Sequence, residues 1–88
     1  MDGLALLAWN LRRVRGMRGI SQERLAADSG VDRAYISELE RKLANPSIPL
    51  LDRIAETLGV PLADLFEQPR ADATPPQPLR SGRKARTA

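Results

Sequence analysis

Apolar residues recur every three or four positions over most of the first 66 residues, and polar residues fill the positions between them. This spacing places the apolar side chains on one face of a helix, so it predicts amphipathic α-helices. The first helix, which we expect to end near Arg18, carries the stripe Leu4, Leu7, Leu11 and Val14. A later helix carries the inward stripe Ile48, Leu51, Ile54 and Leu58. Because no segment alternates apolar and polar residues as a strand does, the pattern predicts an all-α fold.

The stretch SQERLAADSGVDRAYISELER predicts two short helices with almost nothing between them. Ser21 is a favourable N-cap for the first of these, which we expect from Gln22 to about Ser29. Gly30 can adopt the left-handed conformation that ends a helix, and Asp32 can then cap the second one, about Arg33 to Arg41. A turn this tight fixes the angle between the two helices, as it does in a helix–turn–helix.

Two further helices are expected after a turn at the NP dipeptide. Ser47 can cap the fourth helix and Gly59 can end it. The short segment from Val60 to Phe66 predicts a fifth helix, because a proline stands where its first turn would open. We therefore expect five helices within one folded domain, residues 1–67.

The composition and the charge both change beyond that domain. Residues 68–88 contain four prolines, little apolar material and a basic end, which predicts a disordered tail. Residues 1–66 carry nine basic and nine acidic side chains, whereas residues 67–88 carry five basic and two acidic ones. If the folded part binds a polyanion, it must therefore do so with charges placed on one face.

Several classes of function are disfavoured by what the sequence lacks. It contains no Cys and no His, which removes disulfide scaffolds, cysteine nucleophiles and most zinc or haem sites. It also has no glycine-rich phosphate loop and no clustered acid pair, so we expect no enzyme, no metal, no cofactor and no small-molecule ligand. The N-terminal run MDGLALLAWN has no preceding positive charge and is too short for a signal peptide. No stretch approaches the roughly 18 apolar residues of a membrane span, and we expect a cytoplasmic, nucleoid-associated protein.

Several short motifs stand in order along residues 4–66: SQERLA, the glycine turn, RAYISELER, NPS and LGVPLADLF. In this order and spacing they resemble the XRE family of phage-repressor and Cro-type helix-turn-helix regulators. The run DRAYIS is also similar to the controller proteins of restriction–modification systems. The resemblance implies a lambda-repressor-like fold of five helices whose third helix lies in the major groove of double-stranded DNA. It implies a sequence-specific transcription regulator, a repressor or an autoregulatory controller, that binds a palindromic operator as a homodimer formed through the fourth and fifth helices.

The resemblance assigns candidates for DNA contact to the start of the third helix. Arg33 can bond guanine O6 and N7 with both arms of its guanidinium, or it can contact a phosphate; we favour the base. Ala34 either touches a thymine methyl group or contributes only helix propensity, and Ser37 can reach a phosphate or a base edge. Glu38 either accepts a hydrogen bond from cytosine N4 or faces solvent. Tyr35 either stacks in the core or contacts a phosphate, which its spacing favours.

Other candidates stand outside that segment. Gln22 matches the phosphate-binding glutamine of the family, at the start of the second helix. The residues that match the family's backbone-contacting loop, or alternatively form a solvated basic helix end, are Arg41, Lys42 and Asn45. The resemblance also pairs Arg15 with Glu40 as a partly buried, structural ion pair, so we expect Glu40 to read no base.

A second function stays open at this point. An antitoxin-like interaction module would have another protein as its main partner, and its DNA binding would serve autoregulation. A toxin gene beside its own, or co-purification with a second chain, would distinguish this function from that of a self-sufficient regulator.

Overall fold

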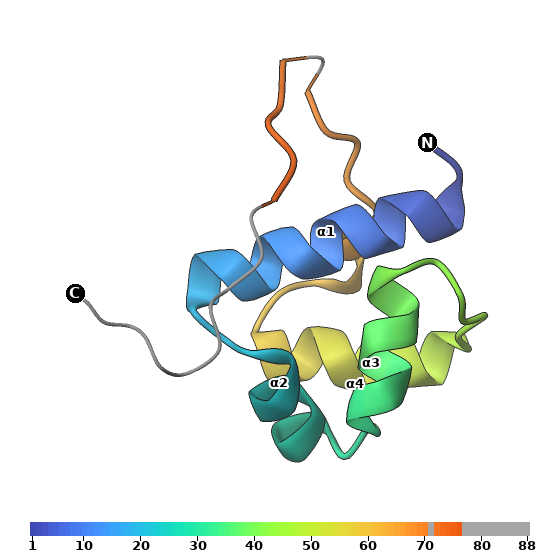
Figure 1. Ribbon diagram of the computed structural model, residues 1–88, viewed down its shortest axis with the longest axis vertical. Coiled ribbons are helices and arrows are strands. Elements are labelled where there is room, and N and C mark those ends of the chain that lie inside the picture. The colour runs from blue at the N-terminus through green and yellow to red at the C-terminus, as the bar shows by residue number, and fades with distance from the viewer. Residues whose placement is uncertain (71, 77–88) are drawn as a thin grey trace.

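The computed structural model describes residues 1–70 and 72–76 (Figure 1). In chain order it contains α1 (Gly3–Arg18), α2 (Gln22–Ser29), α3 (Arg33–Glu40), α4 (Ile48–Leu58) and a short 3-10 helix, η1 (Leu62–Phe66). The described ranges contain no strand, so the all-α class expected from the periodicity is confirmed.

The expected fifth α-helix is wrong in kind. Its place is taken by η1, a 3-10 helix of five residues that begins at Leu62 rather than Val60. Pro61 before it and Glu67 after it are both extended. A segment enclosed between two extended residues has no room to propagate an α-helix, and the tighter 3-10 turn is the usual form of so short a piece.

The helix ends follow the capping residues of the sequence in most places. The Oγ atoms of Ser21 and Ser47 each accept a hydrogen bond from the backbone N–H three residues on, at 3.0 and 3.3 Å. Gly30 ends α2 with φ of 74°, in the left-handed region that favours glycine. The expected cap at Asp32 is wrong in detail, because its side chain accepts no capping hydrogen bond. Its ψ of 137° differs from the 159° to 178° of the other three α-helix N-caps, so its carboxylate is not brought over the first turn.

The core forms where the apolar stripes of the helices meet. α1 packs against η1 and α3, while α2 packs against α3 and α4 (Figure 1). The largest of the fully buried apolar side chains are Leu7, Leu11, Leu25, Ile36, Leu39, Ile54, Leu58 and Leu65. The expected inward stripe of α4 is wrong at Ile48, which is 56% exposed. Ile48 opens its helix, and side chains in a first turn lean toward the helix N-terminus, which places this one beyond the core.

A buried asparagine fastens the C-terminal segment to α1. The Nδ2 of Asn10 donates to the backbone oxygens of Leu6 at 2.9 Å, Leu65 at 3.3 Å and Glu67 at 2.8 Å. The chain after η1 therefore starts its path beside α1 (Figure 1). The expected domain boundary at residue 67 stays a prediction, and most of the expected disordered tail, residues 77–88, lies outside the described residues.

Candidate nucleic-acid interface

α3 divides its residues between the core and the surface. Its buried residues are Ile36, Leu39 and Glu40. Its other side begins with exposed Arg33 and Ala34 and continues, one turn later, with half-buried Ser37 and Glu38. The candidates for base contact thus lie together at the N-terminal half of the helix. A helix that presents its N-terminal residues in this way has the geometry that fits the major groove.

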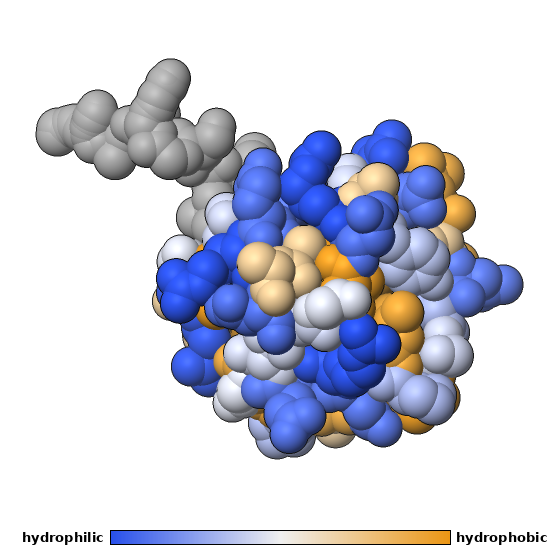
Figure 2. Space-filling model, turned by 90° about the horizontal axis from the view of Figure 1, so that it is seen from below, coloured by the Kyte–Doolittle hydropathy of each residue, from blue (hydrophilic) through white to orange (hydrophobic). Residues whose placement is uncertain are grey.

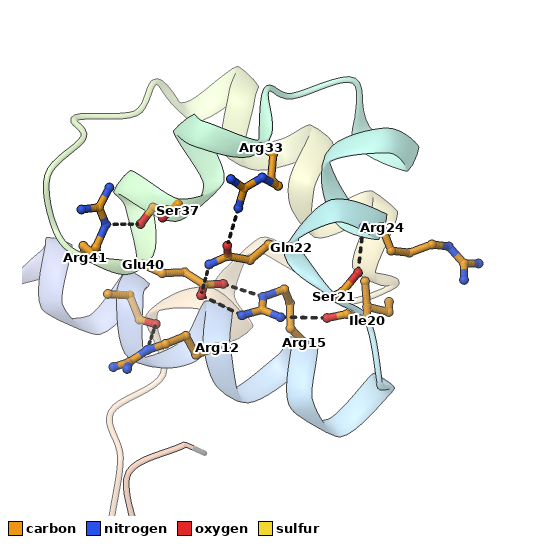
Figure 3. A network of polar contacts seen from close by, with 11 residues as sticks. Arg12, Arg15, Ile20, Ser21, Gln22, Arg24, Arg33, Ser37, Glu40 and Arg41 are labelled. Carbon is orange, nitrogen blue, oxygen red and sulfur yellow. Dashed lines mark hydrogen bonds and ion pairs between the residues drawn. The ribbon is translucent and has the colours of Figure 1, made fainter. Parts of the chain in front are cut away.

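Gln22, the first residue of α2, connects α2 to both ends of α3 (Figure 3). Its Nε2 donates to Glu40 Oε1 at 3.0 Å. Its Oε1 accepts from Arg33 Nη1 at 3.5 Å. The side chain expected to bind a phosphate and the one expected to read a base therefore lie next to each other.

A buried ion pair lies directly behind them. Arg15 Nε is 2.5 Å from Glu40 Oε2, and Arg15 Nη2 donates to Glu40 Oε1 at 2.7 Å. The two side chains are only 7% and 5% exposed. The remaining arm of the guanidinium, Nη1, donates to the backbone oxygen of Ile20 at 2.9 Å. Charged groups that are buried away from water need partners with good hydrogen-bond geometry, which this bidentate pair provides. The pair connects the end of α1 to the end of α3.

The loop after α3 carries the other polar candidates. α3 ends at Glu40, one residue earlier than expected, because Arg41 is its C-cap. Arg41, Lys42 and Asn45 are all exposed, so this loop offers two positive charges next to the end of α3. The Nε of Arg41 donates to the backbone oxygen of Ser37 at 3.4 Å. Lys42 adopts φ of 64°, a left-handed conformation that is uncommon for a residue with a side chain.

Tyr35 lies between the core and the surface, the two environments considered for it in the sequence. Its side chain packs against the core, yet the residue is only half-buried. It lines a hollow of about 380 Å³ together with residues of the α2–α3 turn and of α4. Contact with the core orients the ring, and the part that stays open remains available to a partner.

Arg53, which the sequence analysis does not single out, stabilises the turn between α2 and α3 from α4. Its Nη2 donates to the backbone oxygens of Ser29 at 3.0 Å and Gly30 at 2.9 Å. Carbonyls at the end of a helix lack partners within the helix, and a cation there is favoured by the helix dipole. The contact leaves little room at Gly30, because a Cβ there would lie 3.1 Å from the same Nη2.

The surface on the side of the α2–α3 turn is largely hydrophilic, with a small apolar area (Figure 2). Within residues 1–70 and 72–76, no group of three or more His, Cys, Asp or Glu could hold a metal ion. In those same ranges no helix combines the length and the apolar character that crossing a bilayer requires. The hydrogen-bond donors of the candidate interface belong to arginine, lysine, glutamine and serine side chains. Such donors can bond phosphates and base edges.

Comparison with known proteins agrees with this geometry. The chain is 41% identical over 69 residues to a hypothetical transcription factor from Neisseria meningitidis, a match that spans 78% of this chain and 65% of that protein. The crystal structure of the restriction-modification controller protein C.AhdI from Aeromonas hydrophila has a TM-score of 0.69 and 36% identity, over 72% of this chain and 96% of that one. The controller protein C.Esp1396I, solved as a tetramer with its natural 35-base-pair operator, has a TM-score of 0.68 and 33% identity, over 75% of this chain and 87% of that one.

The helix-turn-helix family is matched by residues 11–65. That region runs from the middle of α1 into η1, and so it contains α2, the turn, α3 and the loop that follows. The motifs that suggested the XRE type lie almost entirely within it. The chain therefore belongs to the helix-turn-helix family, in its XRE type.

Proposed function

We propose that this chain is a sequence-specific, double-stranded DNA-binding transcription regulator that inserts α3 into the major groove. One observation carries the proposal: the N-terminal half of α3 presents Arg33 on an exposed face, while the opposite face of the helix is locked into the core. Relatives named as a transcription factor and as restriction-modification controllers support it. On this proposal the chain acts as a repressor or as an autoregulatory controller.

The base-reading side chains come from α3. Arg33 bonds guanine O6 and N7 with two parallel N–H groups, which discriminates against other bases by about 1–3 kcal/mol. Glu38 accepts from cytosine N4, and Ala34 contacts a thymine methyl group. Ser37, one turn after Arg33, bonds a base edge or the adjacent phosphate.

Phosphate contacts fix the position of the domain on the duplex. Gln22 supplies one of them together with the first N–H groups of α2, where the helix dipole favours an anion. Arg41, Lys42 and Asn45 supply others from the loop after α3. The hydroxyl of Tyr35 adds a further contact from the open side of its ring.

A homodimer formed through α4 and η1 would bind two half-sites at once. The residues Val60, Leu62 and Phe66 lie at this end of the molecule, pack against the core and remain only partly buried. A second copy would cover their exposed parts. The relative C.Esp1396I occurs as a tetramer on its operator, which is consistent with association in this type of regulator. A two-fold symmetric dimer requires a palindromic site with half-sites about one helical turn apart.

Selection from a randomised duplex pool at physiological salt tests the proposal. We expect enrichment of a palindrome with that spacing. Arg33→Ala should then lose the preference at one base pair of each half-site, by about 5-fold to 100-fold. Lys42→Ala, the matched control, should weaken binding to all sequences alike because it removes only a phosphate contact. If no sequence is enriched and binding disappears with salt, α3 does not read bases, and a protein partner becomes the better explanation.

A further inference from the structure

We infer that Glu40, although buried, helps to set the base preference of this protein by positioning Gln22 and, through it, Arg33. The inference rests on the proposed function and deepens it. It assigns a positioning role to a side chain that contacts no DNA.

The argument begins with what each group can donate. A carboxylate only accepts hydrogen bonds, whereas an amide group has a donating and an accepting end. Both Oε atoms of Glu40 accept from Arg15, and Oε1 also accepts from Gln22 Nε2 at 3.0 Å. Only the NH₂ end of the Gln22 amide can face this carboxylate. Its Oε1 must then point to the opposite side.

Arg33 lies on that opposite side. A guanidinium has donors only, so it is attracted by an amide oxygen and repelled by an amide NH₂ group. The distance from Arg33 Nη1 to Gln22 Oε1 is 3.5 Å. Figure 3 shows the four side chains in succession, from Arg15 on α1 through Glu40 and Gln22 to Arg33 at the start of α3. The orientation imposed by Glu40 is therefore the one that draws the guanidinium of Arg33 toward α2.

The size of the effect follows from exposure and distance. An exposed arginine samples many rotamers, and ordering its side chain for a bidentate contact costs up to about 2 kcal/mol. A neighbour that already restricts the side chain in the free protein lowers this cost on binding. The bond to Gln22 is long and open to solvent, so it biases the rotamers of Arg33 without locking them. We expect its loss to reduce base discrimination by about threefold to tenfold, less than the loss of Arg33 itself.

The first test uses Gln22→Met, which keeps the length of the side chain and removes the amide. Affinity is measured for the selected duplex and for one changed at the base pair that depends on Arg33. The ratio of the two affinities should fall about threefold to tenfold, whereas Lys42→Ala should lower both affinities equally. In an Arg33→Ala background, Gln22→Met should leave the remaining ratio unchanged. A further fall there would overturn the inference, because it would show that Gln22 reads the base directly.

The second test addresses Glu40 itself. Glu40→Gln can present either end of its own amide, so it no longer imposes one orientation on Gln22, and the affinity ratio should fall as it does in Gln22→Met. If this variant does not fold, the double variant Arg15→Met with Glu40→Met removes both charges and fills the space with apolar groups, which buried pairs commonly tolerate. The ratio of the two duplex affinities should fall in this double variant as it does in Gln22→Met.

Two results would contradict the inference in different ways. If Gln22→Met or the folded Glu40 variants keep the ratio of the two duplex affinities within about twofold of the wild-type value, the inference is overturned. The proposed function would still stand in that case, provided that Arg33→Ala loses this ratio. If the wild-type protein itself shows no base discrimination, the proposed function fails and the inference fails with it.

Discussion

Removing the carboxylate of Glu40 measures how strongly the buried pair holds α1 against α3. In Glu40→Ala the guanidinium of Arg15, which is 7% exposed, keeps its bond to the Ile20 oxygen and loses both bonds to the carboxylate. Breaking a buried pair in this way costs about 3–5 kcal/mol, and the better helix propensity of alanine offsets only a few tenths. Whole domains are stable by about 5–15 kcal/mol. For a domain of this size, the loss corresponds to a fall in Tm of roughly 12–40 °C.

Urea and thermal unfolding, followed by far-UV circular dichroism and by the fluorescence of Trp9, the single tryptophan, measure this loss. Asp28→Ala is the matched control, because it breaks an exposed pair with Arg24 whose side chains are 70% and 49% exposed. It should change stability by less than about 0.5 kcal/mol. The double variant Arg15→Met with Glu40→Met should recover most of the loss. A Glu40→Ala protein that melts like the wild type would refute the reasoning, since it would show that Arg15 needs no partner.

Two further predictions concern the turn and the tail. Gly30→Ala should lower the free energy of unfolding by about 1–2 kcal/mol, because φ is 74° and the new Cβ would meet Arg53 Nη2 at 3.1 Å; equal urea midpoints for variant and wild type would contradict this. Removing residues 69–88, which carry five basic side chains and one acidic one, should weaken binding to all duplexes equally and flatten its salt dependence. Anisotropy titrations at several salt concentrations measure both effects, and a changed sequence preference would argue against a purely electrostatic tail.

Local rules predicted most of the fold. The bounds of α2 follow from Ser21 and Gly30, because capping depends only on residues within one turn. Periodicity found the buried stripes for the same reason. It failed at Ile48, where the repeat continues into a helix end that has no core beside it. The proline signal failed to specify the kind of helix at η1, where only five residues lie between two extended ones.

The candidate site was harder to predict because its contacts join distant parts of the chain. Gln22 and Glu40 are 18 positions apart, and Arg53 and Gly30 are 23 apart. Such pairs meet only once the helices have packed, and neither periodicity nor capping specifies which side chains then face each other. The pairing of Arg15 with Glu40 came from the resemblance to a family. The contact of Glu40 with Gln22 came from the structure.

The left-handed residue in the loop after α3 places stability and affinity in opposition. Lys42 has φ of 64°, which strains a residue with a side chain by on the order of 1 kcal/mol and would suit glycine better. A glycine there would relax the loop but would remove the ammonium that we assign to a phosphate. Selection for thermal stability would therefore favour glycine at this position, whereas selection for tight operator binding would favour lysine. A library that scores both properties at once should place lysine and glycine at opposite ends of the trade-off.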